Sequence, residues 1–268
     1  MILNVFEYPP LAIYCCVLAA VIGAVLGSFL NCAAWRIAHG ESFVKGRSRC
    51  PSCGHTLGLP DLIPVFSWIF LGGKCRYCKT KVSVRYLLME LFMAAMVLLC
   101  FLQAGLSILF MRNLVFGCIL LVLSLVDMEI YEIPDGCLLI GLIAWVAAEP
   151  FLFVSWTDLA MHLLAGLILG GAILFLSLLF DKLLKKESMG GGDIKLFALA
   201  GLYVGLVQSL FVLLFSCVVG LLLAALIRSR VSEAEGRIPF GPAIAITTWF
   251  VLLYGNYLAD WYLGLLSF

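Results

Sequence analysis

Long apolar runs separated by short polar loops dominate the chain. An α-helix needs roughly 20 apolar residues to cross about 30 Å of hydrocarbon, and most of the runs approach that length. The runs cover residues 11–34, 86–104, 107–126, 137–154, 160–180, 194–208, 209–226 and 241–265. This pattern predicts an all-α polytopic membrane protein with about eight transmembrane helices, with seven as the alternative count.

The composition agrees with this pattern and excludes several classes of protein. Of the 268 residues, 64% are hydrophobic and 12% are charged, whereas a soluble domain is about half apolar and about a quarter charged. A soluble enzyme, a nucleic-acid binder and a disordered segment are therefore excluded. The net charge of +1 indicates no acidic or basic partner. The lipid bilayer is the expected partner of the apolar runs, and no nucleic acid is expected.

A polar insert of about fifty residues interrupts the apolar pattern at 36–85. It contains nine Lys or Arg residues but only two acids, Glu41 and Asp61. The positive-inside rule places such a segment in the cytoplasm. Alternation of eight spans then places 181–192 and 228–240 on the same side, and these loops are also basic: Lys182, Lys185, Lys186, Arg228, Arg230 and Arg237. Both termini are therefore expected outside.

The chain is expected to have three parts. A first span at 1–35 precedes the four-cysteine insert at 36–85, and a seven-helix membrane domain follows at 86–268.

Four of the eleven cysteines form two C-x2-C pairs in the insert, Cys50 with Cys53 and Cys75 with Cys78. Two such pairs at this separation are typical of a structural zinc site with four thiolate ligands. A cytoplasmic location disfavours disulfides. A small polar segment cannot form a large hydrophobic core, so it needs another stabilising feature such as a bound metal ion. Redox pairs and metal-free thiols are the alternatives.

Acidic residues lie at the cytoplasmic ends of apolar runs at two places. Asp127 directly follows one run, and Asp193 follows Gly190, Gly191 and Gly192. Two facing aspartates can share a proton and activate water for attack on a peptide carbonyl. The alternatives are a helix N-cap at Asp193, a helix end at Asp127, and an ion site in a transporter. Lys195 is expected either to reach the interface or to favour the ionised form of Asp193.

A set of motifs runs in order along nearly the whole chain: Gly27-Ser28-Phe29-Leu30-Asn31, Arg36, Gly40-Glu41-Ser42, Arg47-Ser48-Arg49-Cys50-Pro51-Ser52-Cys53-Gly54-His55, Asp61-Leu62-Ile63-Pro64, Ser67-Trp68, Cys75-Arg76-Tyr77-Cys78, Arg85-Tyr86, Glu90, Asp127, Pro134-Asp135, Gly190-Gly191-Gly192-Asp193-Ile194-Lys195 and Pro239-Phe240-Gly241-Pro242. This ordered set resembles the motifs of the bacterial type IV prepilin peptidases.

The resemblance implies a bifunctional enzyme of the bacterial cytoplasmic membrane. Such enzymes cut a short basic leader from type IV prepilin-like precursors, pilins or pseudopilins, on the cytoplasmic face. They then methylate the new amino terminus with S-adenosylmethionine. The protease belongs to the G-x-G-D aspartyl class, whose catalytic aspartates match Asp127 and Asp193. The N-terminal region with the cysteine insert is associated with methyl transfer.

Three polar residues near the insert are candidates for the methyl-transfer site. An amide at Asn31 can bond the polar groups of the methyl donor, and the Arg36 guanidinium can pair with its carboxylate. Glu90 can hold a cation such as the new amino terminus of the substrate. A positive-inside anchor is the alternative role for Arg36.

Two other function classes compete with the membrane protease. An ion-coupled transporter with a cytoplasmic zinc module would place its acids near the bilayer midplane on broken helices, whereas both aspartates here lie at the inner edge. An assembly protein that docks through a zinc module would not need paired aspartates at matched depth. The residue pattern therefore favours the enzyme.

Overall fold

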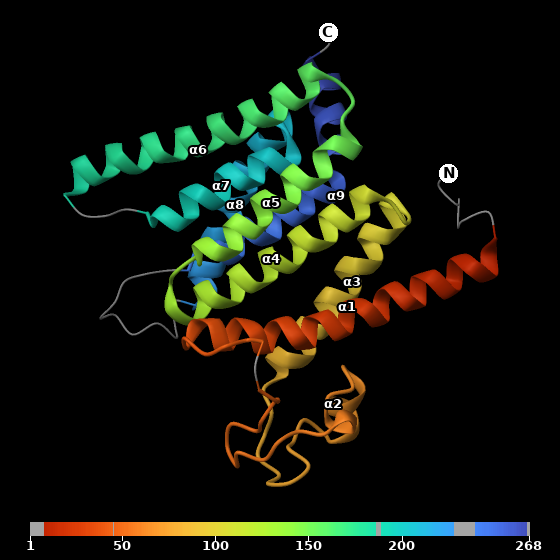
Figure 1. Ribbon diagram of the computed structural model, residues 1–268. Coiled ribbons are helices and arrows are strands. Elements are labelled where there is room, and N and C mark those ends of the chain that lie inside the picture. The colour runs from red at the N-terminus through yellow and green to blue at the C-terminus, as the bar shows by residue number, and fades with distance from the viewer. Residues whose placement is uncertain (1–7, 45, 186–188, 228–238, 267–268) are drawn as a thin grey trace. The chain divides into compact units, whose positions relative to one another are not determined.

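The computed structural model describes residues 8–44, 46–185, 189–227 and 239–266. The described part is helical, with two isolated bridges, Arg49 with Thr56 and Lys74 with Lys81, as its strand-like pairing. In chain order (Figure 1) the helices are α1 (Pro9–Ala38), η2 (Leu59–Asp61), α2 (Phe66–Phe70), α3 (Val84–Ala104), α4 (Ile108–Ile130), α5 (Asp135–Leu152), α6 (Trp156–Leu184), α7 (Gly191–Val204), α8 (Leu206–Ile227) and α9 (Gly241–Leu266).

The chain forms two compact units, Met1–Leu114 and Val115–Phe268, and each is considered by itself. Some residues of the insert and of the loops at 181–192 and 228–240 lie outside the described part: Lys45, Lys186, Ser188, Arg228, Arg230 and Arg237.

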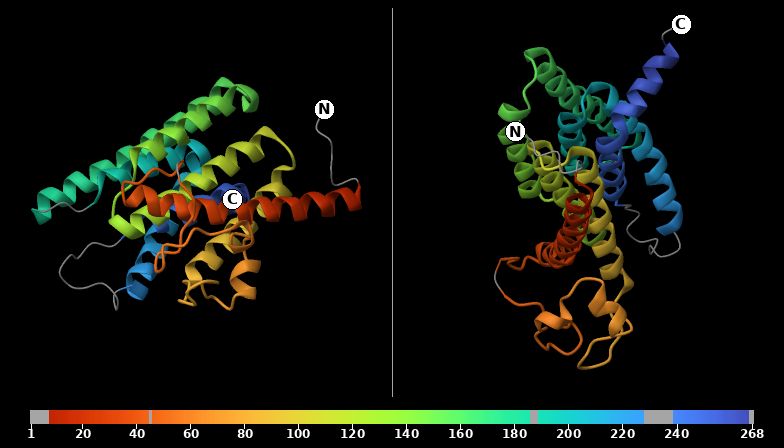
Figure 2. Two further views of the ribbon diagram at one scale, coloured as in Figure 1. Left: turned by 60° about the horizontal axis from the view of Figure 1, so that its bottom comes forward. Right: turned by 90° about the vertical axis from the view of Figure 1, so that its right-hand side faces the viewer.

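In the first unit, α1 and α3 pack closely against each other (Figure 2). Gly23 and Gly27 lie one turn apart on the face of α1 that meets α3. A Cβ atom at Gly23 would lie 2.5 Å from the carbonyl oxygen of Met93, and one at Gly27 would lie 2.8 Å from that of Met89. Only glycine permits so close an approach of two helix backbones. Asn31 follows one turn later on the same face and is buried.

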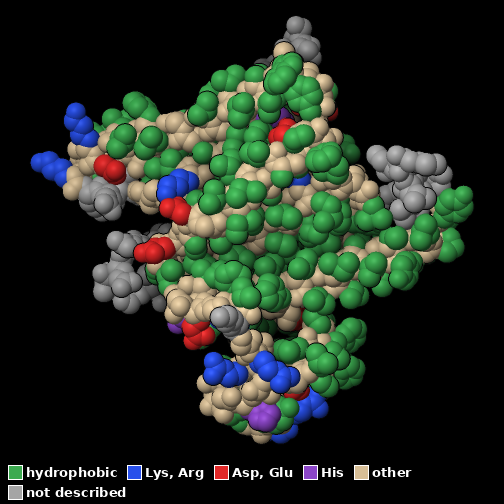
Figure 3. Space-filling model, in the orientation of Figure 1, with side chains coloured by type: hydrophobic (Ala, Val, Ile, Leu, Met, Phe, Trp, Pro, Cys, Tyr) green, Lys and Arg blue, Asp and Glu red, His purple; other side chains and the backbone are tan. Residues whose placement is uncertain are grey.

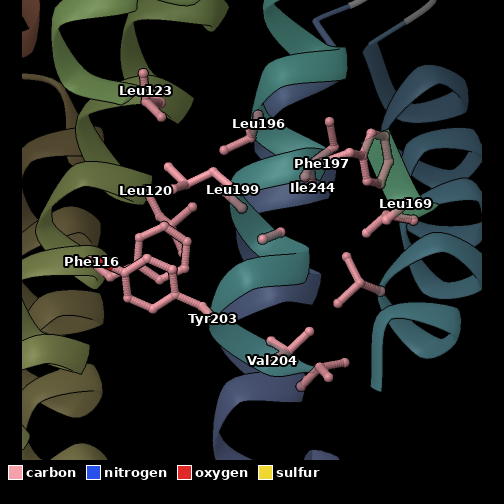
Figure 4. Packing of buried hydrophobic residues seen from close by; sticks show 14 of the residues in the cluster. Phe116, Leu120, Leu123, Leu169, Leu196, Phe197, Leu199, Tyr203, Val204 and Ile244 are labelled. Carbon is pink, nitrogen blue, oxygen red and sulfur yellow. The ribbon is translucent and has the colours of Figure 1, made fainter. Parts of the chain in front are cut away.

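In the second unit, α7 is the central helix and packs against α5, α6, α8 and α9. The ring of Tyr203 on α7 stacks on that of Phe116 with centroids 3.6 Å apart (Figure 4), and its hydroxyl donates a 2.8 Å hydrogen bond to the carbonyl of Gly141. Gly201 lies against α6, where a Cβ atom would come within 2.7 Å of the carbonyl oxygen of Ala165. Neighbours on several sides therefore fix α7, and with it the position of Asp193 in its first turn.

Seven helices are long and apolar enough to cross a membrane: α1, α3, α4, α5, α6, α8 and α9. Hydrophobic side chains cover much of the helical surface drawn in Figure 3. Each of the eight predicted apolar runs contains a helix, but the run at 194–208 corresponds to α7, which has 14 residues and is only about 21 Å long. The chain is an all-helical, multi-pass membrane protein, and α7 alone among the eight helices is shorter than an ordinary span.

Candidate active site

Asp127 lies in the last turn of α4 and is held there by the start of α9. Its side chain is buried, with 5% exposure. The backbone N–H of Gly241, the first residue of α9, donates a 2.8 Å hydrogen bond to Oδ2 of Asp127. A Cβ atom at position 241 would lie 2.8 Å from the same carboxylate oxygen. The contact therefore requires glycine at position 241.

Asp193 lies in the first turn of α7, directly after the three glycines. Its Oδ1 atom is buried and has no hydrogen-bond partner within the described residues. The side chain interacts electrostatically with Asp127. A Cβ atom at Gly192 would meet Cβ of Ile133 at 2.7 Å, so this glycine lets the start of α7 approach the loop that follows α4. The fold thus brings the two predicted carboxyl groups together at the ends of two helices.

Lys195 turns away from the two aspartates. Its Nζ atom pairs with Oδ1 of Asp135 at 2.7 Å, and both side chains are exposed. An exposed ion pair contributes little to stability, about 0–1 kcal/mol. The structure therefore gives Lys195 a partner at the first turn of α5 in place of a contact with Asp193.

Gly241 is the functional residue that sequence reasoning missed. Its motif, Pro239-Phe240-Gly241-Pro242, contributed to the family resemblance, but no role was predicted for it. Phe240 packs near the ring of Phe197, with centroids 6.2 Å apart, and so fixes the start of α9 beside α7. A glycine followed by a proline at a helix start was the available signal, since proline favours the first turn.

The four cysteines of the insert converge in the first unit. Their Sγ atoms all lie within 4.8 Å of one another, and those of Cys50 and Cys78 are 3.8 Å apart. Four sulfurs at about 2.3 Å from a tetrahedral zinc would be separated by roughly 3.8 Å. The donor set and its spacing fit one zinc ion with no open coordination position.

The two cysteine turns share one backbone pattern. In the first turn, the N–H of Cys50 donates to the carbonyl of His55 at 3.0 Å; in the second, the N–H of Cys75 donates to that of Thr80 at 2.9 Å. Gly54 and Lys79, each directly after a second cysteine, both have positive φ, at 69° and 60°. The insert therefore holds its ligands on two equivalent tight turns.

The thiols differ in how readily they ionise. The hydroxyl and backbone of Thr80 lower the pKa of Cys78 to about 6. A hydrogen bond from the His55 backbone acts to lower the pKa of Cys53, but desolvation and its neighbours Cys50 and Cys78 raise it to about 11. Because close thiolates repel one another, a divalent cation is what would let all four ionise together.

Asn31, Arg36 and Glu90 are all buried in the first unit. The side-chain nitrogen of Asn31 has no hydrogen-bond partner in the part of the chain that the structure describes. Arg36 donates from Nη2 to the carbonyl of Arg47 at 3.2 Å, and Oε2 of Glu90 accepts a 2.7 Å hydrogen bond from the N–H of Val65. Arg36 and Glu90 thus bind the backbone of the insert, and Asn31 offers an unused buried donor.

Comparisons with known proteins give the family. The family model "Bacterial Peptidase A24 N-terminal domain" matches residues 21–104, and "Type IV leader peptidase family" matches residues 114–225. The "Type 4 prepilin-like proteins leader peptide-processing enzyme" of Escherichia coli O78:H11 is 33% identical over 92% of this chain and 96% of its own length. The "Prepilin leader peptidase/N-methyltransferase" of Bacillus subtilis (strain 168) is 33% identical over 91% of this chain and 96% of its own.

A third relative, the "Prepilin leader peptidase/N-methyltransferase" of Aeromonas salmonicida (strain A449), is 35% identical over 81% of this chain and 75% of its own. No solved structure gives a significant match to the chain. The matched ranges run through both compact units and span the positions of both cysteine pairs and of both aspartates. The chain belongs to the type IV leader peptidase family.

Proposed function

We propose that this chain cuts the leader peptide from type IV prepilin-like precursors with Asp127 and Asp193 as its catalytic carboxyl groups. It is a prepilin peptidase, and it N-methylates the new amino-terminal residue of its product. Family membership supports the two activities, and the electrostatic interaction of the half-buried Asp193 with the buried Asp127 supports the assignment of the peptidase site. Nothing in the relatives supports the alternative of an ion-coupled transporter, since they are named as peptidases and methyltransferases.

The surroundings of the two aspartates suit different roles. Asp127 accepts a hydrogen bond from the Gly241 N–H, and a donated hydrogen bond favours the carboxylate form. Asp193 has a buried oxygen without a hydrogen-bond partner among the described residues and lies beside Asp127, and a neighbouring negative charge favours the protonated form. We therefore assign Asp127 as the general base and Asp193 as the general acid.

The proposed reaction needs one water between the two carboxyl groups. Asp127 takes a proton from the water while the water oxygen forms a bond to the scissile carbonyl carbon. Asp193 gives its proton to the carbonyl oxygen, which leaves a neutral tetrahedral diol. The diol collapses as the C–N bond breaks, the nitrogen takes the proton held by Asp127, and a diol proton returns to Asp193. The products are a carboxylic acid on the leader and a free amine on the pilin.

The orientation of the chain is part of this proposal. The basic insert and the basic loops support a cytoplasmic position for the inner ends of the spans. Asp127 ends α4 and Asp193 begins α7, so both carboxyl groups would face the cytoplasmic edge of the bacterial inner membrane. With α7 counted as an eighth crossing, both termini would then lie outside.

We further propose that Cys50, Cys53, Cys75 and Cys78 hold one structural zinc ion. The sulfur spacing and the all-thiolate donor set support this ligand set. The ion would join the two cysteine turns, and with four protein ligands it would leave no position for a substrate. Its contribution is therefore stability of the insert rather than catalysis.

The methyl-transfer site is proposed at Asn31, Arg36 and Glu90. S-adenosylmethionine would supply a methyl group carried on a sulfonium ion. The amide nitrogen of Asn31, which has no hydrogen-bond partner among the described residues, suits an acceptor on the methyl donor. The buried charges of Arg36 and Glu90 suit its carboxylate and a cationic amine respectively. The peptidase site has four proposed supporting residues. The start of α7 is formed by Gly190, Gly191 and Gly192, and Lys195 joins α7 to Asp135 of α5.

Incubation of the purified protein with a prepilin and isotopically labelled S-adenosylmethionine tests the proposal. Mass spectrometry of the product should show loss of the leader and gain of one labelled methyl group at the new amino terminus. An intact prepilin after prolonged incubation would contradict the peptidase assignment. A cleaved but unlabelled product would contradict the methyl-transfer assignment alone.

A further inference from the structure

The segment at 59–71, which contains η2 and α2, exposes a cluster of large apolar side chains on the insert. Leu59 is 82% exposed and Phe70 is 83% exposed, and Ile63, Phe66 and Ile69 between them are each at least half exposed. We use the term apolar face for Leu59, Ile63, Phe66, Ile69 and Phe70. The rings of Phe66 and Phe70 stack with centroids 6.3 Å apart, so part of this face is continuous. Such exposure on a polar insert marks an interaction surface.

One hydrogen bond joins this segment to the side of the membrane-spanning helix α3. The N–H of Val65, at the start of α2, donates to Oε2 of Glu90 at 2.7 Å. Glu90 is six residues inside α3, which begins at Val84, so its backbone lies about 9 Å along the helix. The start of α2 therefore lies beside the second turn of α3, where the neighbouring side chains of α3, Leu87, Leu88, Met89 and Leu91, are apolar.

The one acid of the segment is held in an ion pair that neutralises it. Asp61 accepts hydrogen bonds from Nε of Arg76 at 2.6 Å and from the Tyr77 hydroxyl at 3.1 Å, and its side chain is only 5% exposed. Gly58 donates a further backbone N–H at 3.1 Å. Residues 59–73 contain no other charged side chain. The segment thus presents no unpaired charge that would keep it out of an apolar environment.

The rest of the insert has a basic surface. Its nine Lys or Arg residues outnumber its two acids, and Figure 3 shows Lys and Arg side chains gathered on the insert near hydrophobic ones. Basic residues beside an apolar face match the two layers of a lipid leaflet, because headgroups of the inner leaflet are anionic and acyl chains lie below them.

We propose that the 59–71 segment is seated in the cytoplasmic leaflet of the bilayer, with the apolar face among acyl chains and the basic residues of the insert at anionic headgroups. The insert then is not a free cytoplasmic domain on two tethers but a membrane-docked one. This inference goes beyond the proposed function and does not depend on which residues catalyse either reaction. An apolar helix of a substrate is the competing occupant of the face.

Site-specific photo-crosslinking in a bilayer tests the seating. The full chain, with p-benzoyl-phenylalanine in place of Phe70, is placed in nanodiscs of phosphatidylcholine and phosphatidylglycerol and irradiated. Replacement of His55, an exposed aromatic residue on the first cysteine turn, provides the matched control. Mass spectrometry should find lipid adducts at position 70 and at least tenfold fewer at position 55.

Three results would overturn the proposal. These are absence of lipid adducts at position 70, adducts to the chain itself in place of lipid, and replacement of lipid adducts by prepilin adducts when a prepilin is added. Phe66 lies on the same face and serves as a second labelling position if the first variant does not accumulate. Retained peptidase activity shows that each labelled protein is folded.

Discussion

The backbone N–H of Gly241 lies 2.8 Å from Oδ2 of Asp127, although 114 residues separate the two in the chain. This hydrogen bond joins the start of α9 to the end of α4. It fixes one carboxylate oxygen, and the absence of a Cβ atom at position 241 leaves room for it. Because Asp193 belongs to α7, which packs against α9, the same hydrogen bond influences the distance between the two carboxyl groups that we propose to be catalytic.

Gly241→Ala should lower kcat for prepilin cleavage by about a hundredfold, since a displacement of a catalytic group by about 1 Å costs this much. The added methyl group would lie 2.8 Å from the carboxylate oxygen and would push Asp127 from its position. KM should change little, because the substrate-binding surface is not altered. Steady-state cleavage kinetics provide the measurement.

Gly136→Ala is the matched control for this substitution, because a Cβ atom there meets nothing within 4 Å. It should cleave at the parental rate. Parental kcat in Gly241→Ala would contradict a positioning role for the glycine.

The three glycines before Asp193 should differ in their tolerance of alanine. A Cβ atom at Gly191 meets nothing within 4 Å, whereas one at Gly192 would lie 2.7 Å from Cβ of Ile133. Gly191→Ala should therefore retain cleavage within about twofold, and Gly192→Ala should reduce it by about tenfold or more. Cleavage assays on both purified variants, with their melting temperatures, check the prediction; equal tolerance at both positions would contradict it.

The substitution Gly191→Pro tests whether the backbone at Gly190–Gly192 must move to admit the substrate. Gly191 is the first residue of α7, and Gly190 before it is extended, with φ −68° and ψ 140°; proline suits both conditions. The variant should therefore fold, and its cleavage rate should fall because the loop is stiffened. A correctly folded Gly191→Pro protein with parental cleavage would show that no such movement is needed.

Replacement of one cysteine ligand should remove zinc from the insert. Cys75→Ser should lower the bound zinc from one ion per chain towards zero and should impair methyl transfer more than cleavage, because the two aspartates belong to the other compact unit. Elemental analysis and the two activities measured in parallel check this. Cys217→Ser, at an exposed cysteine of α8, is the control and should retain both; a zinc-free parental protein purified without chelator would contradict the metal site.

Asn31→Ala and Glu90→Ala should each reduce methylation of an already cleaved pilin by about tenfold or more, as expected for loss of a hydrogen bond to a charged group, and should leave cleavage of the prepilin near the parental rate. Glu90→Gln keeps an oxygen that can accept the Val65 N–H, so it separates the backbone contact from the negative charge. Loss of methylation in Glu90→Gln would indicate that the negative charge of Glu90 is required. Retained methylation would indicate that its hydrogen bond with the Val65 N–H is sufficient. Unchanged methylation in both alanine variants would exclude the proposed site.

Much of the fold could be predicted because apolar length and cysteine spacing are local signals. Each predicted run contains a helix, and Cys50, Cys53, Cys75 and Cys78 converge as two tight turns require. The run at 194–208 was predicted as one transmembrane helix, but Gly205, at φ 90°, ends α7 after Val204, and the rest of the run belongs to α8, which begins at Leu206. The contact of Gly241 with Asp127 could not be predicted, because it depends on how distant helices pack rather than on any local pattern.

The paired substitutions Asp127→Asn and Asp193→Asn test the central claim most directly, with labelled S-adenosylmethionine and mass spectrometry as the readout. Each variant should cleave prepilin at least about 10³-fold more slowly, and the double variant should be little worse, because two groups that act as a unit are not additive. All three should still methylate an already cleaved pilin, which shows that they are folded. Cleavage by either single variant at close to the parental rate would contradict the assignment of these two carboxyl groups as the catalytic pair.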